Sequence, residues 1–193
     1  MAEITWGVWN CSGLLPSSSA QTKMDFLNSY TEKKFDVLVL IETHHKARGD
    51  ISSLLQTYTN DSVLIETEAT QVDPYAGIAV LISNKFTLLE ETTLVQGRLL
   101  NFKIQGYKKV YNVTAMYGYT SSNASQEKMT YMTTSLLKHH NMSDNNIILG
   151  DFNFVENDSP RTNQSRSGLS DPFRVRNPKH ILYLALSLVC MSR

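Results

Sequence analysis

The chain has 193 residues and a mass of 21.8 kDa, which fits one globular domain and is short for two. Hydrophobic residues make up 41% and charged residues 19%, which excludes a disordered or fibrous chain. Eighteen basic residues balance eighteen acidic ones, so overall charge gives no support for nucleic-acid binding. A polyanion would therefore have to bind to a local patch of basic residues.

The cysteine content and the ends of the chain bear on the cellular compartment. Cys11 and Cys190 cannot form a disulfide framework and match no zinc-binding spacing. Glu3 lies where a secretion signal needs positive charge, and the apolar run 180–190 is far shorter than the roughly 20 residues that span a bilayer. We therefore expect an intracellular protein, nuclear or cytoplasmic, that is neither secreted nor bound to a membrane.

Apolar runs and their spacing predict alternating strands and helices along the chain. In chain order they predict a strand at 4–9, a helix at 20–32, a strand at 37–41, a helix at 51–58, strands at 63–65, 76–83, 86–95, 99–104 and 110–116, a helix at 123–140, a strand at 147–149 and a polar loop at 155–179. No internal repeat or linker interrupts this order. It predicts a single α/β layered domain.

Three of the predicted strands end in polar residues of the same chemical kind. Asn10 and Glu42 each follow an apolar run, and Asp151 and Asn153 follow a third. Sites in α/β sheets lie at such strand ends, and carboxylate and amide oxygens are the ligands that Mg²⁺ takes together with water and phosphate. Phosphate-ester hydrolysis is the natural use of such a set. The alternative is that these residues only end strands, since Asn and Asp form turns, but Glu42 is not a turn residue.

Five short blocks carry a family resemblance. They are Trp9–Leu14, Ile41–His44, Gly77–Leu81, Met116–Tyr119 and Leu149–Asn153. In order and approximate spacing they resemble the endonuclease/exonuclease/phosphatase superfamily, over about residues 4 to 183. The Glu-Thr-His form of the second block and the stretches 153–161 and 169–183 are most similar to the endonuclease domain of LINE-type (non-LTR) retrotransposons.

The resemblance implies a fold and a metal-dependent activity. The fold is a four-layer α/β sandwich with two facing mixed sheets flanked by helices. The activity is DNA phosphodiester cleavage with Mg²⁺, or Mn²⁺ as the alternative. Glu42 matches the principal metal ligand, with Asn10 and Asp151 beside the metal, and Asn10 also lies by the phosphate. Asp151 and Asn153 match the pair that orients the attacking water and contacts the phosphate.

Two further residues enter through the same resemblance. Tyr117 matches the family's active-site tyrosine, and His44 matches a position near the substrate. The usual Tyr-x-Pro-Asn block reads Tyr117-Gly118-Tyr119-Thr120 here, so its phosphate-contacting Asn is absent. Thr120 can replace only part of that hydrogen bonding.

The C-terminal part departs from the family pattern. We expect an incomplete domain at 1–183, followed by an atypical apolar tail at 184–193, because the last two strands with their Ser-x-Ile-Asp and Asp-His blocks are not found. The histidine of the missing Asp-His block is the family's phosphate-binding or acid/base group. A residue in that role contributes ~10²- to 10⁴-fold in rate, so weak or absent activity is expected. In the parent element, a reverse transcriptase domain is an expected partner.

Two other functions stay open at this point. One is a non-catalytic remnant that binds DNA or metal, and the other is a phosphatase or phosphodiesterase of the same superfamily that acts on phosphoinositides or sphingolipids. The stretch 161–180 carries a net charge of positive four, which fits a loop that tracks a DNA backbone or a solvated surface equally well.

Overall fold

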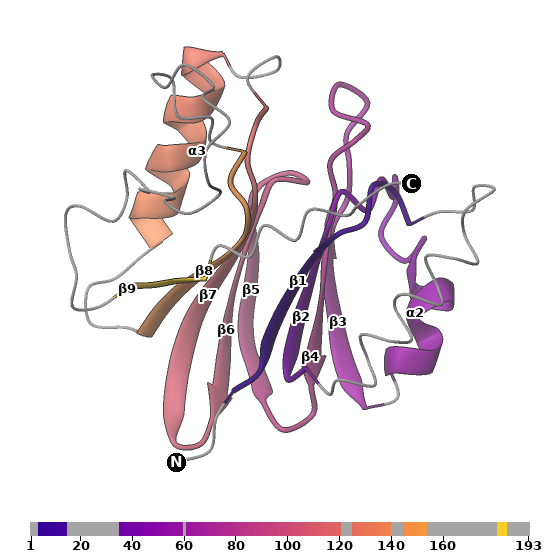
Figure 1. Cartoon of the computed structure of the whole chain (residues 1–193), viewed down its shortest axis with the longest axis vertical. Coiled ribbons are helices and arrows are strands. Elements are labelled where there is room, and N and C mark those ends of the chain that lie inside the picture. The colour runs from indigo at the N-terminus through magenta and orange to yellow at the C-terminus, as the bar shows by residue number, and fades with distance from the viewer. Residues whose placement is uncertain are drawn as a thin grey trace, which may run out of the picture.

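A computed structural model describes residues 4–14, 35–59, 61–120, 125–139, 145–153 and 181–184. These residues form two β-sheets that face each other, with α2 against the outer side of one sheet and α3 against the outer side of the other (Figure 1). The predicted helix at 20–32, the loop at 155–179 and the basic stretch 161–180 lie outside the described residues. Residues 185–193 of the expected apolar tail also lie outside the described residues.

The first sheet contains the N-terminal strands in the order β1-β2-β4-β3. Their bounds are β1 Trp6–Asn10, β2 Val37–Ile41, β3 Ser62–Thr67 and β4 Ile78–Ser83. β1 and β2 run parallel, whereas β4 pairs antiparallel with both β2 and β3. The sheet is therefore mixed, and the ends of β1 and β2 lie side by side.

The second sheet has the order β5-β6-β7-β8-β9. Its strands are β5 Thr87–Val95, β6 Leu99–Gly106, β7 Lys109–Tyr117, β8 Asn145–Asp151 and β9 Ile181–Leu184. The first three are antiparallel neighbours, and β7, β8 and β9 are parallel. The boundary expected at 183/184 falls inside β9, which pairs with β8.

Alternating apolar side chains build the core between the two sheets. In β2, Val37, Val39 and Ile41 pack toward the second sheet, while Leu38 and Leu40 pack on the opposite face toward α2. All five side chains are buried, as predicted for a strand covered on both faces. β1 and β2 contact β8 across this core, and a hydrogen bond between Tyr117 and Glu42 joins the end of β7 to the end of β2.

The two described helices cover the outer faces. α2 spans Ser52–Thr59, and α3 spans Gln126–His139. α3 buries Met132 and Leu136 against the outer face of the second sheet, which makes its methionines core residues. The two facing mixed sheets agree with the predicted sandwich, whereas α2 and α3 are the only flanking helices within the described residues. Within the described residues, no helix has the length and apolar character needed to cross a membrane.

A ladder of buried asparagines joins three strands of the second sheet beneath the end of α3. Asn112 is fully buried, and its Oδ1 accepts a hydrogen bond from Nδ2 of Asn101 at 3.0 Å. Its own Nδ2 donates to Oδ1 of Asn146 at 2.8 Å and to the backbone carbonyl of His139 at 2.9 Å. Asn112 thus ties β7 to β6, to β8 and to the C-terminal end of α3.

We expect Asn112→Ala to lower the free energy of unfolding by about 3 kcal/mol, because it removes hydrogen-bond partners from buried polar groups. Urea denaturation with an unchanged m value would measure the loss. The control is Asn145→Ala, since Asn145 is exposed and its side chain donates to the Val110 carbonyl at 2.9 Å. Its expected loss is about 1 kcal/mol or less. Equal losses for the two variants would contradict the assigned role of the ladder.

Candidate active site

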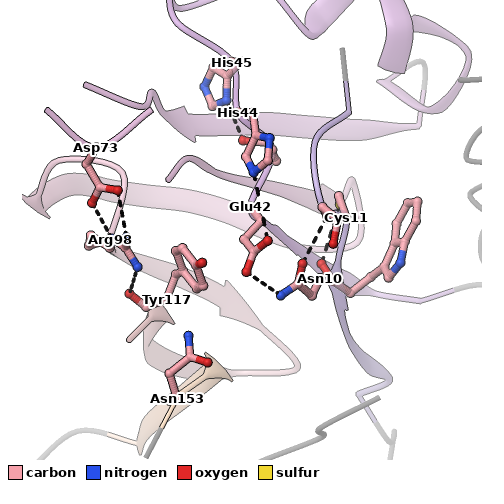
Figure 2. A network of polar contacts seen from close by, with 12 residues as sticks. Asn10, Cys11, Glu42, His44, His45, Asp73, Arg98, Tyr117 and Asn153 are labelled. Carbon is pink, nitrogen blue, oxygen red and sulfur yellow. Dashed lines mark hydrogen bonds and ion pairs between the residues drawn. The ribbon is translucent and has the colours of Figure 1, made fainter. Parts of the chain in front are cut away.

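Asn10 and Glu42 lie together at the ends of β1 and β2. Asn10 is the last residue of β1 and pairs in register with Ile41, so Glu42 follows immediately on the neighbouring strand. The Asn10 amide Nδ2 donates to Glu42 Oε1 at 2.8 Å, and its Oδ1 accepts the backbone N–H of Ser12 at 3.1 Å. The amide is thus fixed with one end on the carboxylate (Figure 2).

Tyr117 and Asp151 end the adjacent parallel strands β7 and β8, in register with each other. The Tyr117 side chain is buried and lies on the side of the site that faces Glu42 (Figure 2). Burial raises the pKa of its hydroxyl well above the ordinary value, and the hydrogen bond and negative charge of Glu42 raise it further, against the opposing effect of Arg98. Tyr117 therefore stays protonated at neutral pH and can act as a hydrogen-bond donor.

The loop after β8 brings Asn153 back toward the end of β7. Asp151 Oδ1 accepts the backbone N–H of Asn153 at 3.0 Å, and Asn153 Nδ2 donates to the carbonyl of Gly118 at 3.0 Å. The N–H of Gly118 donates in turn to the carbonyl of Asp151 at 2.7 Å. A Cβ at Gly118 would lie 2.1 Å from the carbonyl oxygen of Phe152, so only glycine permits this close approach.

Strained backbone marks three of the predicted site residues. Glu42, His44 and Asn153 have φ values of 54°, 57° and 48°, in the left-handed region that residues other than glycine rarely adopt. Such residues cost on the order of 1–3 kcal/mol each and cluster at functional sites. The strain at Glu42 is the most telling, because asparagine and histidine adopt this conformation several-fold more often than other residues with a side chain.

His44 lies beside the Glu42 carboxylate. Its Nε2 is 4.0 Å from Glu42 Oε2, and both side chains are partly exposed. The His44 ring meets the ring of Tyr75 edge to face with centroids 5.4 Å apart, and Tyr75 is 66% exposed. The structure therefore brings together Asn10, Glu42 and His44 from one sheet, close to Tyr117 from the other.

A second histidine, His45, is buried behind the site. Its Nδ1 lies 2.6 Å from Oγ1 of Thr43, and its Nε2 lies 3.6 Å from Oε2 of Glu66. Burial lowers the pKa of His45, although the negative charge of Glu66 opposes the effect. Thr43 and His45 are fully buried and Glu66 is nearly so, which makes this group a support for the loop after β2 and gives it no surface for a substrate.

The buried His45 predicts a pH dependence of stability. A histidine with an ordinary pKa of about 6.5 takes up a proton in the unfolded chain, whereas the lowered pKa resists protonation in the folded chain. Stability is therefore present above about pH 6.5 and is lost as the pH falls toward the lowered value. We expect His45 to account for about 1 kcal/mol of lost unfolding free energy between pH 7.5 and 5.5.

Urea denaturation at the two pH values would test this. His45→Gln should reduce the pH dependence, while His139→Gln, at an exposed position in α3, should leave it as in the unmodified chain. The same dependence in the unmodified chain and in His45→Gln would show that other groups are responsible.

Arg98 and Asp73 join the site in the structure, although the sequence gives no sign of them. Arg98 is 2% exposed, and its guanidinium binds both carboxylate oxygens of Asp73 at 2.7 and 2.8 Å (Figure 2). The guanidinium carbon also lies 4.0 Å from the centre of the Tyr117 ring. In the sequence, Arg98 follows Gly97 in a turn between two predicted strands. An arginine at such a position is typically exposed, so the sequence gives no reason to expect a buried ion pair.

The donor set fits a hard divalent cation. Glu42 and Asp151 could supply carboxylate oxygens, and Asn10 could supply an amide oxygen. In the part of the chain that the structure describes, no cluster of three or more His, Cys, Asp or Glu could hold a metal ion. Mg²⁺ does not need one, since it is commonly bound through one or two carboxylates, with water and substrate phosphate in its other positions.

The sequence pattern described as "Endonuclease/Exonuclease/phosphatase family" matches residues 7–187, nearly the whole chain. The chain belongs to this family. Nucleases and phosphatases hydrolyse phosphate esters, and members of the family typically use Mg²⁺. The oxygen ligands at the strand ends agree with that chemistry. None of the curated proteins matches the sequence.

Several solved structures share the fold of this chain. TDP2 of D. rerio, complexed with a single-strand DNA product, has a TM-score of 0.59 at 19% identity, over 77% of this chain and 60% of that one. An AP endonuclease from Archaeoglobus fulgidus has a TM-score of 0.58 at 14% identity, over 78% and 57%. A β-hairpin deletion mutant of β-toxin from Staphylococcus aureus has a TM-score of 0.54 at 15% identity, over 82% and 69%. The chain spans less than two thirds of the length of the first two proteins.

Proposed function

We propose that this chain is a divalent-metal-dependent phosphodiester hydrolase that acts on DNA. The observation that carries the proposal is the meeting of two sets of polar strand ends. Asn10 and Glu42 come from β1 and β2 of the first sheet, and Tyr117 and Asp151 come from β7 and β8 of the second. Groups from both sheets would hold the metal, and groups of the second sheet would also bind the phosphate and orient the attacking water, so that a phosphodiester would lie between the two sheets.

Each residue has a role that its chemistry and position support. Glu42, with Asn10 and Asp151, would hold Mg²⁺. When bound, this ion would neutralise negative charge on the phosphoryl oxygens. The Asp151 carboxylate would orient and deprotonate the attacking water. Asn153 has a second amide N–H besides the one it donates to Gly118, and this N–H can bind a phosphate oxygen.

Tyr117 and His44 complete the proposed site. The Tyr117 hydroxyl remains protonated because its pKa is raised. Its single O–H donates to Glu42 in this structure and would turn from that carboxylate to a phosphate oxygen that gains charge in the transition state. His44, 4.0 Å from Glu42, lies where it can contact the substrate beside the metal.

More specifically, we propose that the chain is an endonuclease of the LINE retrotransposon type. It would act in the nucleus or the cytoplasm. The block Ile41–His44 and the resemblance over 153–161 and 169–183 support it. A reverse transcriptase domain in the same element would be its partner. DNA as the substrate class is supported by the D. rerio TDP2 structure, which contains a single-strand DNA product.

Nicking of supercoiled plasmid by the 193-residue chain tests the proposal. With Mg²⁺ we expect slow conversion to the open-circular form, in line with the weak activity expected from the sequence, and with EDTA we expect none. Mn²⁺ in place of Mg²⁺ separates the two candidate metals. Binding of Mg²⁺ or DNA without nicking would favour a non-catalytic remnant. Release of phosphate or head group from phosphoinositide or sphingomyelin vesicles, with intact plasmid, would favour the lipid-directed alternative.

A further inference from the structure

Arg98 occupies a place in which a charged side chain is costly. It lies in the turn between β5 and β6, and only 2% of the residue is exposed. Removing a guanidinium from water costs several kcal/mol unless its charge and its donors are matched. The partners of Arg98 therefore indicate what the side chain does.

Those partners occupy all three nitrogens of the guanidinium. Nε and Nη2 bind the two carboxylate oxygens of Asp73 at 2.7 and 2.8 Å, a bidentate pair that fixes the plane of the group. Nη1 donates to the carbonyl of Gly118 at 2.9 Å and makes a longer contact with the carbonyl of Tyr117 at 3.4 Å. The backbone carbonyl of Arg98 accepts the N–H of Tyr117 at 2.9 Å. Arg98 thus holds the backbone at the end of β7 from two directions.

The flat face of the guanidinium also contacts aromatic rings. Its central carbon lies 4.0 Å from the centre of the Tyr117 ring and 4.7 Å from the centre of the Tyr119 ring. Cation–π contacts of this kind are stronger when they are shielded from water. The ring of Tyr117 is therefore packed against a group whose own orientation is set by Asp73.

The Gly118 carbonyl connects Arg98 to the other side of the site. A carbonyl oxygen has two lone pairs, and this one accepts from Arg98 Nη1 and from Asn153 Nδ2, at 2.9 and 3.0 Å. The N–H of Gly118 binds the Asp151 carbonyl. A change in the position of Arg98 would therefore move the Gly118 peptide unit and, with it, the Asn153 side chain that hydrogen-bonds to it.

We propose that Arg98, held in place by Asp73, is a positioning residue that sets the Tyr117 ring and the Asn153 amide relative to the Glu42 carboxylate. It acts on the rate of the chemical step and not on DNA binding. This inference rests on the proposed function, because the positioned groups are those assigned to phosphate binding. Lysine cannot take its place, since one ammonium group cannot bind Asp73 bidentately and reach the Gly118 carbonyl.

Plasmid nicking by Arg98→Lys tests the rate effect. We expect kcat to fall about 10- to 100-fold, as for displacement of a reacting group by about 1 Å, while KM for DNA changes less than about threefold. The matched control is Arg48→Lys, because Arg48 also pairs with a carboxylate, that of Glu91, but is 63% exposed. Its kcat and KM should stay within about twofold of the unmodified chain.

A second readout does not depend on activity. In protein labelled with ¹⁵N-asparagine, the side-chain amide resonance of Asn153 can be assigned by its loss in Asn153→Gly, which keeps the positive φ accessible. We expect that resonance to shift in Arg98→Lys and to stay in place in Arg48→Lys. If Arg98→Lys does not fold, Asp73→Asn replaces it, with the same shift and a fall in kcat of about 3- to 10-fold.

The two proposals fail in different ways. An unmoved Asn153 resonance, or a kcat that falls only in proportion to the folded fraction measured by circular dichroism, would overturn the positioning role. If the unmodified chain nicks no DNA under any metal condition, the proposed function fails. The amide shift then still decides whether Arg98 positions Asn153.

Discussion

Glu42→Gln is expected to lower metal-dependent DNA nicking by about 10³-fold, the largest loss for any single residue of the site. Glutamine has the same size, and its amide oxygen can still accept the Asn10 Nδ2 hydrogen bond that Glu42 Oε1 accepts at 2.8 Å. The variant therefore keeps the local geometry and removes only the negative charge. A neutral amide is a much weaker ligand for Mg²⁺ than a carboxylate.

Calorimetric titration with Mg²⁺ should show weaker binding in parallel with the lost nicking. The control is Glu90→Gln, because Glu90 is 57% exposed and pairs with Lys103 at 2.9 Å on the surface of the second sheet. That variant should nick at the unmodified rate. Nicking by Glu42→Gln within threefold of the unmodified chain would remove Glu42 from the metal site.

Asp151→Asn is expected to lower the nicking rate by about 10²- to 10³-fold through loss of the general base. Asparagine can still accept the backbone N–H of Asn153, which Asp151 Oδ1 accepts at 3.0 Å, so the turn after β8 is retained. The position loses its charge and its ability to take a proton from water. We expect the loss in kcat to exceed the change in KM for DNA.

Asp50→Asn provides a matched control for Asp151. Asp50 Oδ2 also accepts backbone N–H groups of its own turn, from Lys46 and Ala47, but the residue is exposed and outside the proposed site. Rates that fall equally in the two variants would mean that Asp151 serves only to shape its turn. That result would revive the alternative in which polar residues merely end the strands.

Local patterns in the sequence locate eight of the nine described strands of this protein and miss β9 at Ile181–Leu184. Each apolar run that predicts a strand overlaps one in the structure, and Val37–Ile41 matches β2 from end to end. The reason is that a strand buried on both faces needs an unbroken run of apolar and β-branched residues. Glu42 stands out by the same logic, since it interrupts such a run without a turn-forming side chain.

Strand ends also place the candidate site residues on the correct elements. Asn10, Glu42, Tyr117 and Asp151 all lie at the ends of parallel strands, where side chains from neighbouring strands come close together. Family blocks in the sequence point to these same positions. The register in which these strands pair, and the way in which the two sheets pack face to face, cannot be predicted from any single segment.

The tertiary structure alone decides the supports of the site. Arg98 and Asp73 are 25 residues apart and lie in separate turns, and nothing local to either residue predicts a buried ion pair. The left-handed backbone at Glu42 runs against the preference of glutamate. Local sequence patterns report the preferences of a segment, whereas buried charge pairs and strained backbone exist only because distant segments hold them in place.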